Sequence, residues 1–275
     1  MASMAGLLLE VGLRVTWLQI AHAIRTSRLA WVLPANFIFV PALTVGLARV
    51  FHLPTDISIG MALLAAAPFA PVVPIFAKMA KADLALAAGL TALFPFVAAF
   101  LTPLVCQISL GFLPHSEALR FHFLTILIVL VSTITLPLMA GVAIHHFFPS
   151  ARGRLLRPVE ILSEVTGALS LAFVTAVEFK TIISTGWKSF FVMSLVFECS
   201  LVVGYLLSGS SAAERQVVAL GTSNRNIALE ILVAVGSFPG TPVVAAVVAN
   251  GLLLIFLGLL HVAFWRLRAR RVADV

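Results

Sequence analysis

The stretch Ala219-Leu220-Gly221-Thr222-Ser223-Asn224-Arg225-Asn226-Ile227 interrupts an otherwise apolar segment that covers about 213–236. Its six central residues, 221–226, have little hydrophobicity and include one full positive charge. A charge at the middle of a bilayer costs about 2.5–3.5 kcal/mol on insertion scales, so such a stretch must face protein or a water-filled cavity. We therefore interpret it as a break within a membrane-spanning helix.

The rest of the chain has the composition of an all-α, polytopic membrane protein. Of its 275 residues, 61% are hydrophobic and 11% are charged, and its mean hydropathy is +1.11. Soluble domains are about 45–50% apolar and about 25% charged. The net charge of +7 is spread over short connections, which indicates membrane topology and not a nucleic-acid partner. Cys106 and Cys199 lie in apolar segments at a spacing that matches no metal or redox motif.

Hydrophobic segments predict about nine membrane segments. The first, 4–13, is too short for a hydrocarbon core of about 30 Å. We interpret it as the remnant of a helix that continues into an amphipathic connection ending at Arg28. Eight full spans follow, at 29–50, 57–79, 84–108, 121–144, 158–179, 189–207, 213–236 and 241–265.

Lysines and arginines predict the orientation of these spans. With the C-terminus in the cytoplasm, thirteen of them fall in inner connections, four fall in outer connections, and Arg225 remains inside a span. This bias follows the positive-inside rule and predicts a multi-pass protein of the plasma (inner) membrane. We expect one transmembrane domain over 1–275, with a first repeat at about 1–110, a second at about 121–266, and a basic cytoplasmic tail at 267–275. The inner cations are Arg14, Arg25, Arg28, Lys78, Lys81, Arg152, Arg154, Arg157, Arg215, Arg266, Arg268, Arg270 and Arg271, and the outer ones are Arg49, Arg120, Lys180 and Lys188.

A second interruption lies in the span at 57–79, where three prolines fall within seven positions. Each proline removes a backbone donor and clashes with a preceding carbonyl. The two interrupted spans run in opposite directions, as an inverted repeat predicts, and paired interruptions of this kind mark the binding site of a transporter. Half-helix N-termini near the midplane favour an anion, and the planar guanidinium of Arg225 suits a carboxylate or a sulfonate. The candidate substrate-binding residues are Pro68, Pro71, Pro74, Thr222, Asn224, Arg225 and Asn226.

Each of these candidates also has a purely structural interpretation. Arg225 is alternatively a cation bonded to carbonyls that the breaks set free. The prolines are alternatively kinks and nothing more. Asn224 and Asn226 are alternatively caps of the helix that resumes after the break, and capping is compatible with binding.

Pro68, the connection Lys81-Ala82-Asp83-Leu84-Ala85-Leu86, and Gly221 with Asn224 are the points at which the chain most resembles the bile acid:sodium symporter family. The resemblance covers nearly the whole chain. It implies ten helices in two inverted five-helix repeats, in which the fourth and ninth helices are broken and cross near the substrate and sodium sites. It also implies a core and a panel of helices that move against each other. By this comparison the chain begins within the family's second helix and lacks the first.

The sodium positions implied by the resemblance are largely changed. Val73 and Pro74 stand where relatives usually have Ser-Asn, and Phe69 and Ala70 replace glycines. Ala219 and Ser223 replace Glu and Gln, and Ala87 replaces a serine, whereas Thr91 matches a sodium ligand. The remaining candidates for ion coupling are Thr91, Ser223, Asn224, Glu230 and Glu198, the last of which is the favoured proton carrier.

We therefore expect a secondary active transporter that moves a small organic anion by alternating access. Sodium coupling is implied by the resemblance, and no cofactor is expected beyond a possible sodium ion. The alternatives are proton-coupled or uncoupled transport by the same fold, or a non-transporting membrane sensor or structural protein. An enzyme is not expected, because no metalloprotease, serine-hydrolase or Cys/His metal motif is present. The expected partners are the anion and the lipid bilayer, without nucleic acid, and the sequence does not give the oligomeric state.

Overall fold

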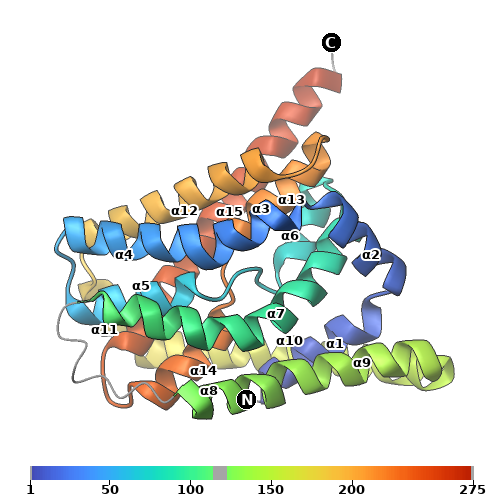
Figure 1. The fold of residues 1–275 in the computed structure, drawn as a ribbon, viewed down its shortest axis with the longest axis horizontal. Helices are drawn as coiled ribbons and strands as arrows, with labels where there is room; N and C mark the ends of the chain where they lie inside the picture. Colours follow the sequence, from blue (N-terminus) through green and yellow to red (C-terminus); the bar gives the residue numbers. More distant parts are fainter. Residues whose placement is uncertain (1, 114–122, 274–275) are drawn as a thin grey trace.

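The computed structural model describes residues 2–113 and 123–273, and its regular elements in those ranges are all helices (Figure 1). The prediction of an all-α fold is confirmed. Two π-helical turns, Ala35–Phe39 and Val131–Thr135, join α3 to α4 and α8 to α9. The helices are α1 (Ala2–Arg14), α2 (Trp17–Thr26), α3 (Leu29–Pro34), α4 (Val40–Val50), α5 (Thr55–Ala65), α6 (Val73–Ala80), α7 (Leu84–Gly111), α8 (Phe123–Leu130), α9 (Leu136–Phe147), α10 (Pro149–Val177), α11 (Phe179–Ser184), α12 (Trp187–Leu207), α13 (Ala212–Ser223), α14 (Ile227–Ser237) and α15 (Val243–Ala273).

Six helical stretches in the described part of the chain are long and apolar enough to cross a membrane. They are Leu29–Val50, Leu84–Gly111, Phe123–Phe147, Pro149–Val177, Trp187–Leu207 and Val243–Arg268. All six overlap predicted spans, although α10 begins at Pro149, earlier than predicted. Residues 121 and 122 of one predicted span, and the last two residues of the predicted tail, lie outside the described residues. The number of nine segments and the inverted repeat remain predictions.

The short first segment ends in a sharp corner. α1 and α2 meet at an angle of 92°, and together they would count as a seventh, broken span. Thr16 starts α2 with a capping box, in which its hydroxyl accepts from the N–H of Gln19 and the Gln19 side chain accepts from the N–H of Thr16. α2 packs against α7 with Ala23 buried, while Trp17 and Leu18 are exposed, which fits the predicted amphipathic connection.

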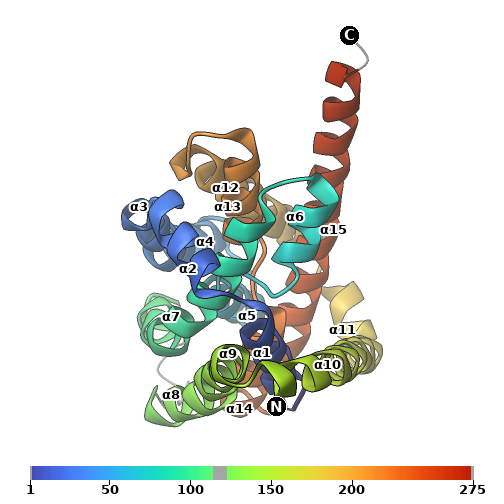
Figure 2. The ribbon, with the colours of Figure 1, turned by 90° about the vertical axis from the view of Figure 1, so that its right-hand side faces the viewer.

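α1 packs closely against α9 and α10, and Figure 2 shows these three helices together, apart from α12, α13 and α3. The contact with α9 depends on two glycines, because a Cβ on Gly12 would lie 2.3 Å from the Leu138 carbonyl and one on Gly141 would lie 2.4 Å from the Leu9 carbonyl. The contact with α10 is polar: Arg14 pairs with Glu160 (2.5 Å). We call α1, α8, α9 and α10 the α1 layer.

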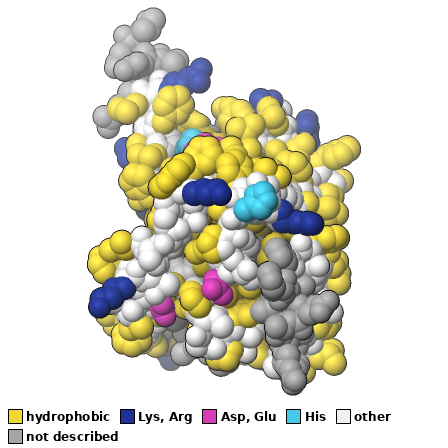
Figure 3. Space-filling model, turned by 90° about the vertical axis from the view of Figure 1, so that its left-hand side faces the viewer, with side chains coloured by type: hydrophobic (Ala, Val, Ile, Leu, Met, Phe, Trp, Pro, Cys, Tyr) yellow, Lys and Arg dark blue, Asp and Glu magenta, His cyan; other side chains and the backbone are white. Residues whose placement is uncertain are grey.

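Much of the molecular surface is apolar, as contact with lipid requires. On α10, the side chains of Leu162, Leu169 and Phe173 are 66%, 65% and 68% exposed. Figure 3 shows some Lys, Arg, His and acidic side chains among many hydrophobic ones on the face seen from the left of Figure 1. An exposed apolar surface of this extent would be unusual for a soluble monomer and fits a protein embedded in a bilayer.

The two interrupted segments, α5–α6 and α13–α14, lie in the interior. Every residue from Ile57 to Ala70 is buried, and so is every residue from Val217 to Asn226. α5 packs against α15, α4 and α14, while α13 packs against α12, α6 and α7. The breaks are therefore enclosed by protein, as a polar stretch at membrane depth requires.

Candidate functional site

The two breaks lie directly against each other. The first runs from the end of α5 at Ala65 to the start of α6 at Val73, and the second from the end of α13 at Ser223 to the start of α14 at Ile227. Pro68 and Arg225 face each other in an antiparallel bridge. The predicted crossing of two broken helices is therefore observed in the structure.

Hydrogen bonds between the two breaks replace the helical bonds that each break loses. The N–H of Phe69 donates to the carbonyl of Gly221 (3.1 Å), and the N–H of Ala70 donates to that of Asn224 (3.1 Å). In the other direction, the N–H of Asn226 donates to the carbonyl of Ala67 (2.8 Å). As a result, the start of α14 lies beside the end of α5, and the start of α6 lies beside the end of α13. The positive end of each half-helix thus meets the negative end of another.

Three successive carbonyls at the end of α5 accept hydrogen bonds from other segments. The Ala65 carbonyl accepts from Nη1 of Arg225 (3.2 Å), the Ala66 carbonyl from the Thr102 hydroxyl (2.8 Å), and the Ala67 carbonyl from Asn226, as described above. These are carbonyls that α5 would have bonded internally had it continued. Satisfying them is essential in a membrane, where water is not available to do so.

Arg225 is the charged residue at the centre of this crossing, and its side chain is only 4% exposed. Besides Ala65, its Nη1 points at the Asn36 carbonyl at 3.5 Å. Asn36 lies in the π-helical turn, five residues before Pro41, and the missing N–H and bulk of that proline explain why regular helical bonding is lost there. Nη2 of Arg225 has no hydrogen-bond partner, and no carboxylate of the described residues forms an ion pair with Arg225.

A small cavity of about 10 Å³ lies against Arg225, which is room for about one water molecule. Besides Arg225, four polar side chains contribute to its wall, and one of them, Asn250, has a buried amide oxygen without a partner among the described residues. The full lining is Val40, Thr44, Met61, Ala65, Val196, Phe197, Ser200, Ser223, Arg225, Asn250 and Leu254. The cavity thus joins a free guanidinium donor, hydroxyl and amide groups, and an apolar wall.

The other polar residues of the second break are mostly engaged by their neighbours. The Asn226 side chain caps α14 by accepting from the N–H of Leu229 (3.2 Å), so the capping interpretation is confirmed for this residue. The Asn224 amide donates to the Leu220 carbonyl (3.0 Å), and the Ser223 hydroxyl donates to the Ala219 carbonyl (2.9 Å). The Thr222 hydroxyl accepts from the Asn36 amide (3.2 Å). Their contact with a substrate or an ion remains a prediction.

The first break depends on proline and on a buried ring. Pro68 forms the bridge to Arg225, and Pro74 lies in the first turn of α6, where a missing N–H costs nothing. Phe69, which stands where relatives usually have glycine, adopts the left-handed conformation with φ of 60°. Its ring is fully buried and stacks on Phe94 with 4.0 Å between the ring centroids. A Cβ on Gly221 would lie 2.0 Å from this ring, so only glycine fits there.

The candidates for ion coupling are not brought together at one point. Glu198, on α12, is 44% exposed and pairs with Nε2 of His261 on α15 (3.2 Å). Thr91 on α7 is buried, and its hydroxyl has no partner. Glu230 on α14 is completely buried, and neither of its carboxylate oxygens has a partner in the described part of the chain. Among the described residues, no ion pair joins Glu230 to Arg225.

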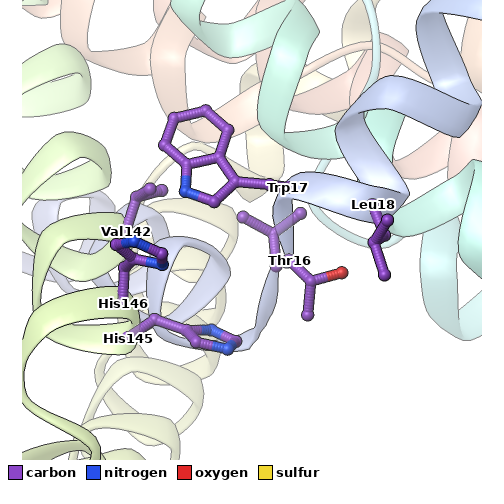
Figure 4. Close-up of a pocket in the computed structure, with 7 residues that line it drawn as sticks. Thr16, Trp17, Leu18, Val142, His145 and His146 are labelled. Atoms are coloured by element: carbon purple, nitrogen blue, oxygen red, sulfur yellow. The ribbon is translucent and has the colours of Figure 1, made fainter.

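A second cavity, of about 130 Å³, lies at the corner between α1 and α2 (Figure 4). Trp17, Thr16 and Leu18 line it from the corner, and Val142, His145 and His146 line it from the end of α9. It is larger than the cavity at Arg225, but its wall holds no Lys, Arg, Asp or Glu. We therefore place the candidate site at the crossing and not here.

Sequence comparisons agree with the resemblance. A sequence profile of the Sodium Bile acid symporter family matches residues 2–185. The "Uncharacterized sodium-dependent transporter YocS" of Bacillus subtilis (strain 168) is 22% identical over 173 residues, which cover 62% of this chain and 52% of that protein. The "Probable sodium/metabolite cotransporter BASS2, chloroplastic" of Oryza sativa subsp. japonica is 23% identical over 273 residues, which cover 98% of this chain and 64% of that protein. The matches thus span about half to two thirds of the length of these relatives.

Proposed function

The chain belongs to the Sodium Bile acid symporter family, and from that premise we propose that it is a secondary active transporter of a small organic anion. Its apolar helices and its relatives support an integral, multi-pass membrane protein. Relatives named as sodium-dependent support cation coupling, with sodium as the first candidate. The name of neither relative identifies the anion that this chain carries.

The observation that carries this proposal is the state of Arg225. A buried cation is costly unless an opposite charge or several hydrogen bonds compensate it. Among the described residues, Arg225 has carbonyl partners on Nη1 but none on Nη2, and no carboxylate pairs with it. An anionic substrate group would supply both the missing charge and an acceptor. Arg225 is the one buried Lys or Arg among the described side chains, which favours one carboxylate or sulfonate on the substrate. The mixed wall of hydroxyl, amide and apolar side chains favours a small body attached to that group.

The size of the cavity supports alternating access. A cavity of about 10 Å³ is too small for any organic anion, so the helices around it must separate for a substrate to enter. The 92° corner between α1 and α2 is one of the chain connections between the α1 layer and the remaining helices, and it would serve as a hinge. In this proposal the layer is the family's panel, and the crossing belongs to the core. The two repeats, at about 1–110 and 121–266, and the cytoplasmic C-terminus complete the proposed arrangement.

The test uses purified full-length protein, a panel of small carboxylates and sulfonates, and the variant Arg225→Gln. We expect at least one anion to raise the melting temperature of the wild type and to exchange across proteoliposomes in counterflow. Arg225→Gln should lose both effects, because it keeps a hydrogen-bonding side chain without the charge. The matched control is Arg49→Gln, which removes an exposed arginine at the end of α4 and should behave as the wild type.

Two results would contradict the proposal. Counterflow by Arg225→Gln at the wild-type rate would exclude the arginine as the anion site. A wild type that binds an anion but never exchanges it would favour the alternative of a non-transporting sensor. Neither result depends on which cation drives transport, because counterflow needs no ion gradient.

A further inference from the structure

Glu230 is a buried carboxylate for which the described contacts provide no compensation. It is 0% exposed, and both of its oxygens lack hydrogen-bond partners. It lies in the first turn of α14, one turn after Asn226 caps that helix and five residues after Arg225. A structural carboxylate at this depth would be expected to have a partner, because an uncompensated buried charge costs several kcal/mol. Such a group is placed to take up a proton or a metal cation.

The groups that surround Glu230 do not supply that cation. α14 packs against α5, α15 and α8, and α8 contains no titratable residue. On α5, Asp56 lies in the first turn, at the end of the helix far from the break. On α15, His261 is already paired with Glu198. Cys106 on α7 is a buried thiol and carries no positive charge. Arg225 is the nearest cation along the chain, and it forms no ion pair with Glu230.

We propose that Glu230 binds the coupling cation, Na⁺ or H⁺, and that Arg225 and Glu230 couple the two transported ions through their opposite charges. This inference rests on the proposed function, because it requires an anion at Arg225. In the empty protein Arg225 and Glu230 carry opposite charges that sum to zero, although no ion pair joins the two side chains. An anion that neutralises Arg225 leaves the charge of Glu230 unbalanced, and the cation then neutralises Glu230. In the fully loaded protein the anion neutralises Arg225 and the cation neutralises Glu230. The empty and fully loaded proteins thus have no net buried charge at this pair of residues, and we propose that only these two states change between the outward-open and inward-open forms.

This cation position differs from the one that the family resemblance implies. The implied carboxylate would stand at 219 in α13, where this chain has alanine, and other implied oxygen ligands are replaced by Ala87, Val73 and Pro74. Glu230 lies on the other side of the crossing, within α14. The carboxylate that the resemblance implies before the break, at 219, is thus absent. A different carboxylate, Glu230, lies after the break, where it is buried and has no partner among the described residues.

The experiment measures the melting temperature of the purified full-length protein without any organic substrate. One series replaces choline chloride by sodium chloride at constant ionic strength, and a second series varies the pH between about 6 and about 8. A cation that binds only the folded state at 100 times its Kd should raise the melting temperature by about 5–10 °C. A saturable rise with sodium identifies Na⁺, and a rise only with falling pH identifies H⁺.

The variant Glu230→Gln decides whether Glu230 is the site. The amide has the same shape but no charge, so this variant should fold and should lose the dependence on sodium or on pH. Glu178→Gln is the matched control: it removes a carboxylate at the C-terminal end of α10, away from the two breaks, and should keep the wild-type dependence. The proposal is overturned if Glu230→Gln responds as the wild type does, or if the wild type responds to neither cation.

Failure of this inference is distinguishable from failure of the proposed function. The anion panel used for Arg225 can be repeated on Glu230→Gln. If anions still stabilise Glu230→Gln, and Arg225 is required for that effect, the anion site stands whatever the cation results are. If the cation dependence follows Glu230 but no anion acts through Arg225, the cation site stands alone and the coupling between the two residues is rejected.

Discussion

The two breaks at the centre of this molecule pair with each other but are built from different chemistry. The first, 66–72, has prolines and a buried aromatic ring, and none of its residues is charged. The second, 224–226, has two asparagines around a buried arginine. In the first break the backbone is interrupted because donors are missing. In the second, polar side chains compete for backbone groups, and one of them caps the helix that resumes. We therefore interpret the first break as an element that fixes the shape of the backbone, and the second as the candidate binding element.

The largest expected effect comes from forcing the two breaks apart. In Gly221→Val, the added side chain would meet the Phe69 ring at the point where the breaks touch. We expect destabilisation by more than about 3 kcal/mol, so that the protein is lost as a single species in size-exclusion chromatography. Gly46→Ala is the control, since nothing lies within 4 Å of a Cβ there. If Gly221→Val melts as the wild type does, the close contact between the breaks is not needed for stability.

Phe69 separates the role of the ring from that of the left-handed backbone. Phe69→Ala removes a fully buried ring and should lower the free energy of unfolding by about 3–5 kcal/mol. Phe69→Gly removes the same ring but also relieves the strain of a left-handed residue, so it should be about 1 kcal/mol more stable than Phe69→Ala. At an ordinary position with negative φ, a substitution by glycine destabilises a protein more than one by alanine, so this order would be the reverse of the usual one. Chemical denaturation of both variants gives the order, and the reverse order would show that no strain is stored at Phe69.

The smallest expected effect tests the cap that only the second break has. Asn226→Ala removes the acceptor for the Leu229 N–H and should cost about 1 kcal/mol, or a fall of about 2–4 °C in melting temperature. Asn226→Ser keeps a side-chain acceptor, so its melting temperature should fall less than that of Asn226→Ala. Pro71→Ala is the counterpart in the first break and should change the melting temperature very little, because Pro71 is only half-buried and the neighbouring prolines remain. If Asn226→Ala and Pro71→Ala lower the melting temperature by the same amount, the proposed difference between the breaks is contradicted.

Several features of the site depend on contacts that no local pattern in the sequence reveals. Asn36 lies more than 180 residues from Thr222 and Arg225 in the sequence, yet its side-chain amide donates to the Thr222 hydroxyl. Its carbonyl, which the π-helical turn before Pro41 leaves free, accepts from Arg225. His261 holds Glu198 from a different helix, so the favoured proton carrier has a partner that the sequence did not indicate. The nearby proline was the only local signal for Asn36, and His261 had none beyond its place in an apolar segment.

By itself, the sequence determined the class of the fold, most of the long spans and the positions of both breaks. These features depend on local composition, because the bilayer requires long apolar runs and makes every charge or proline within them conspicuous. The tertiary structure alone decided that the breaks bond to each other, that Arg225 has carbonyl partners on one side only, and that Glu230 is buried without a partner. Those properties depend on which distant backbone groups meet in space. Whether a buried donor or acceptor finds a hydrogen-bond partner is decided only when the chain has folded.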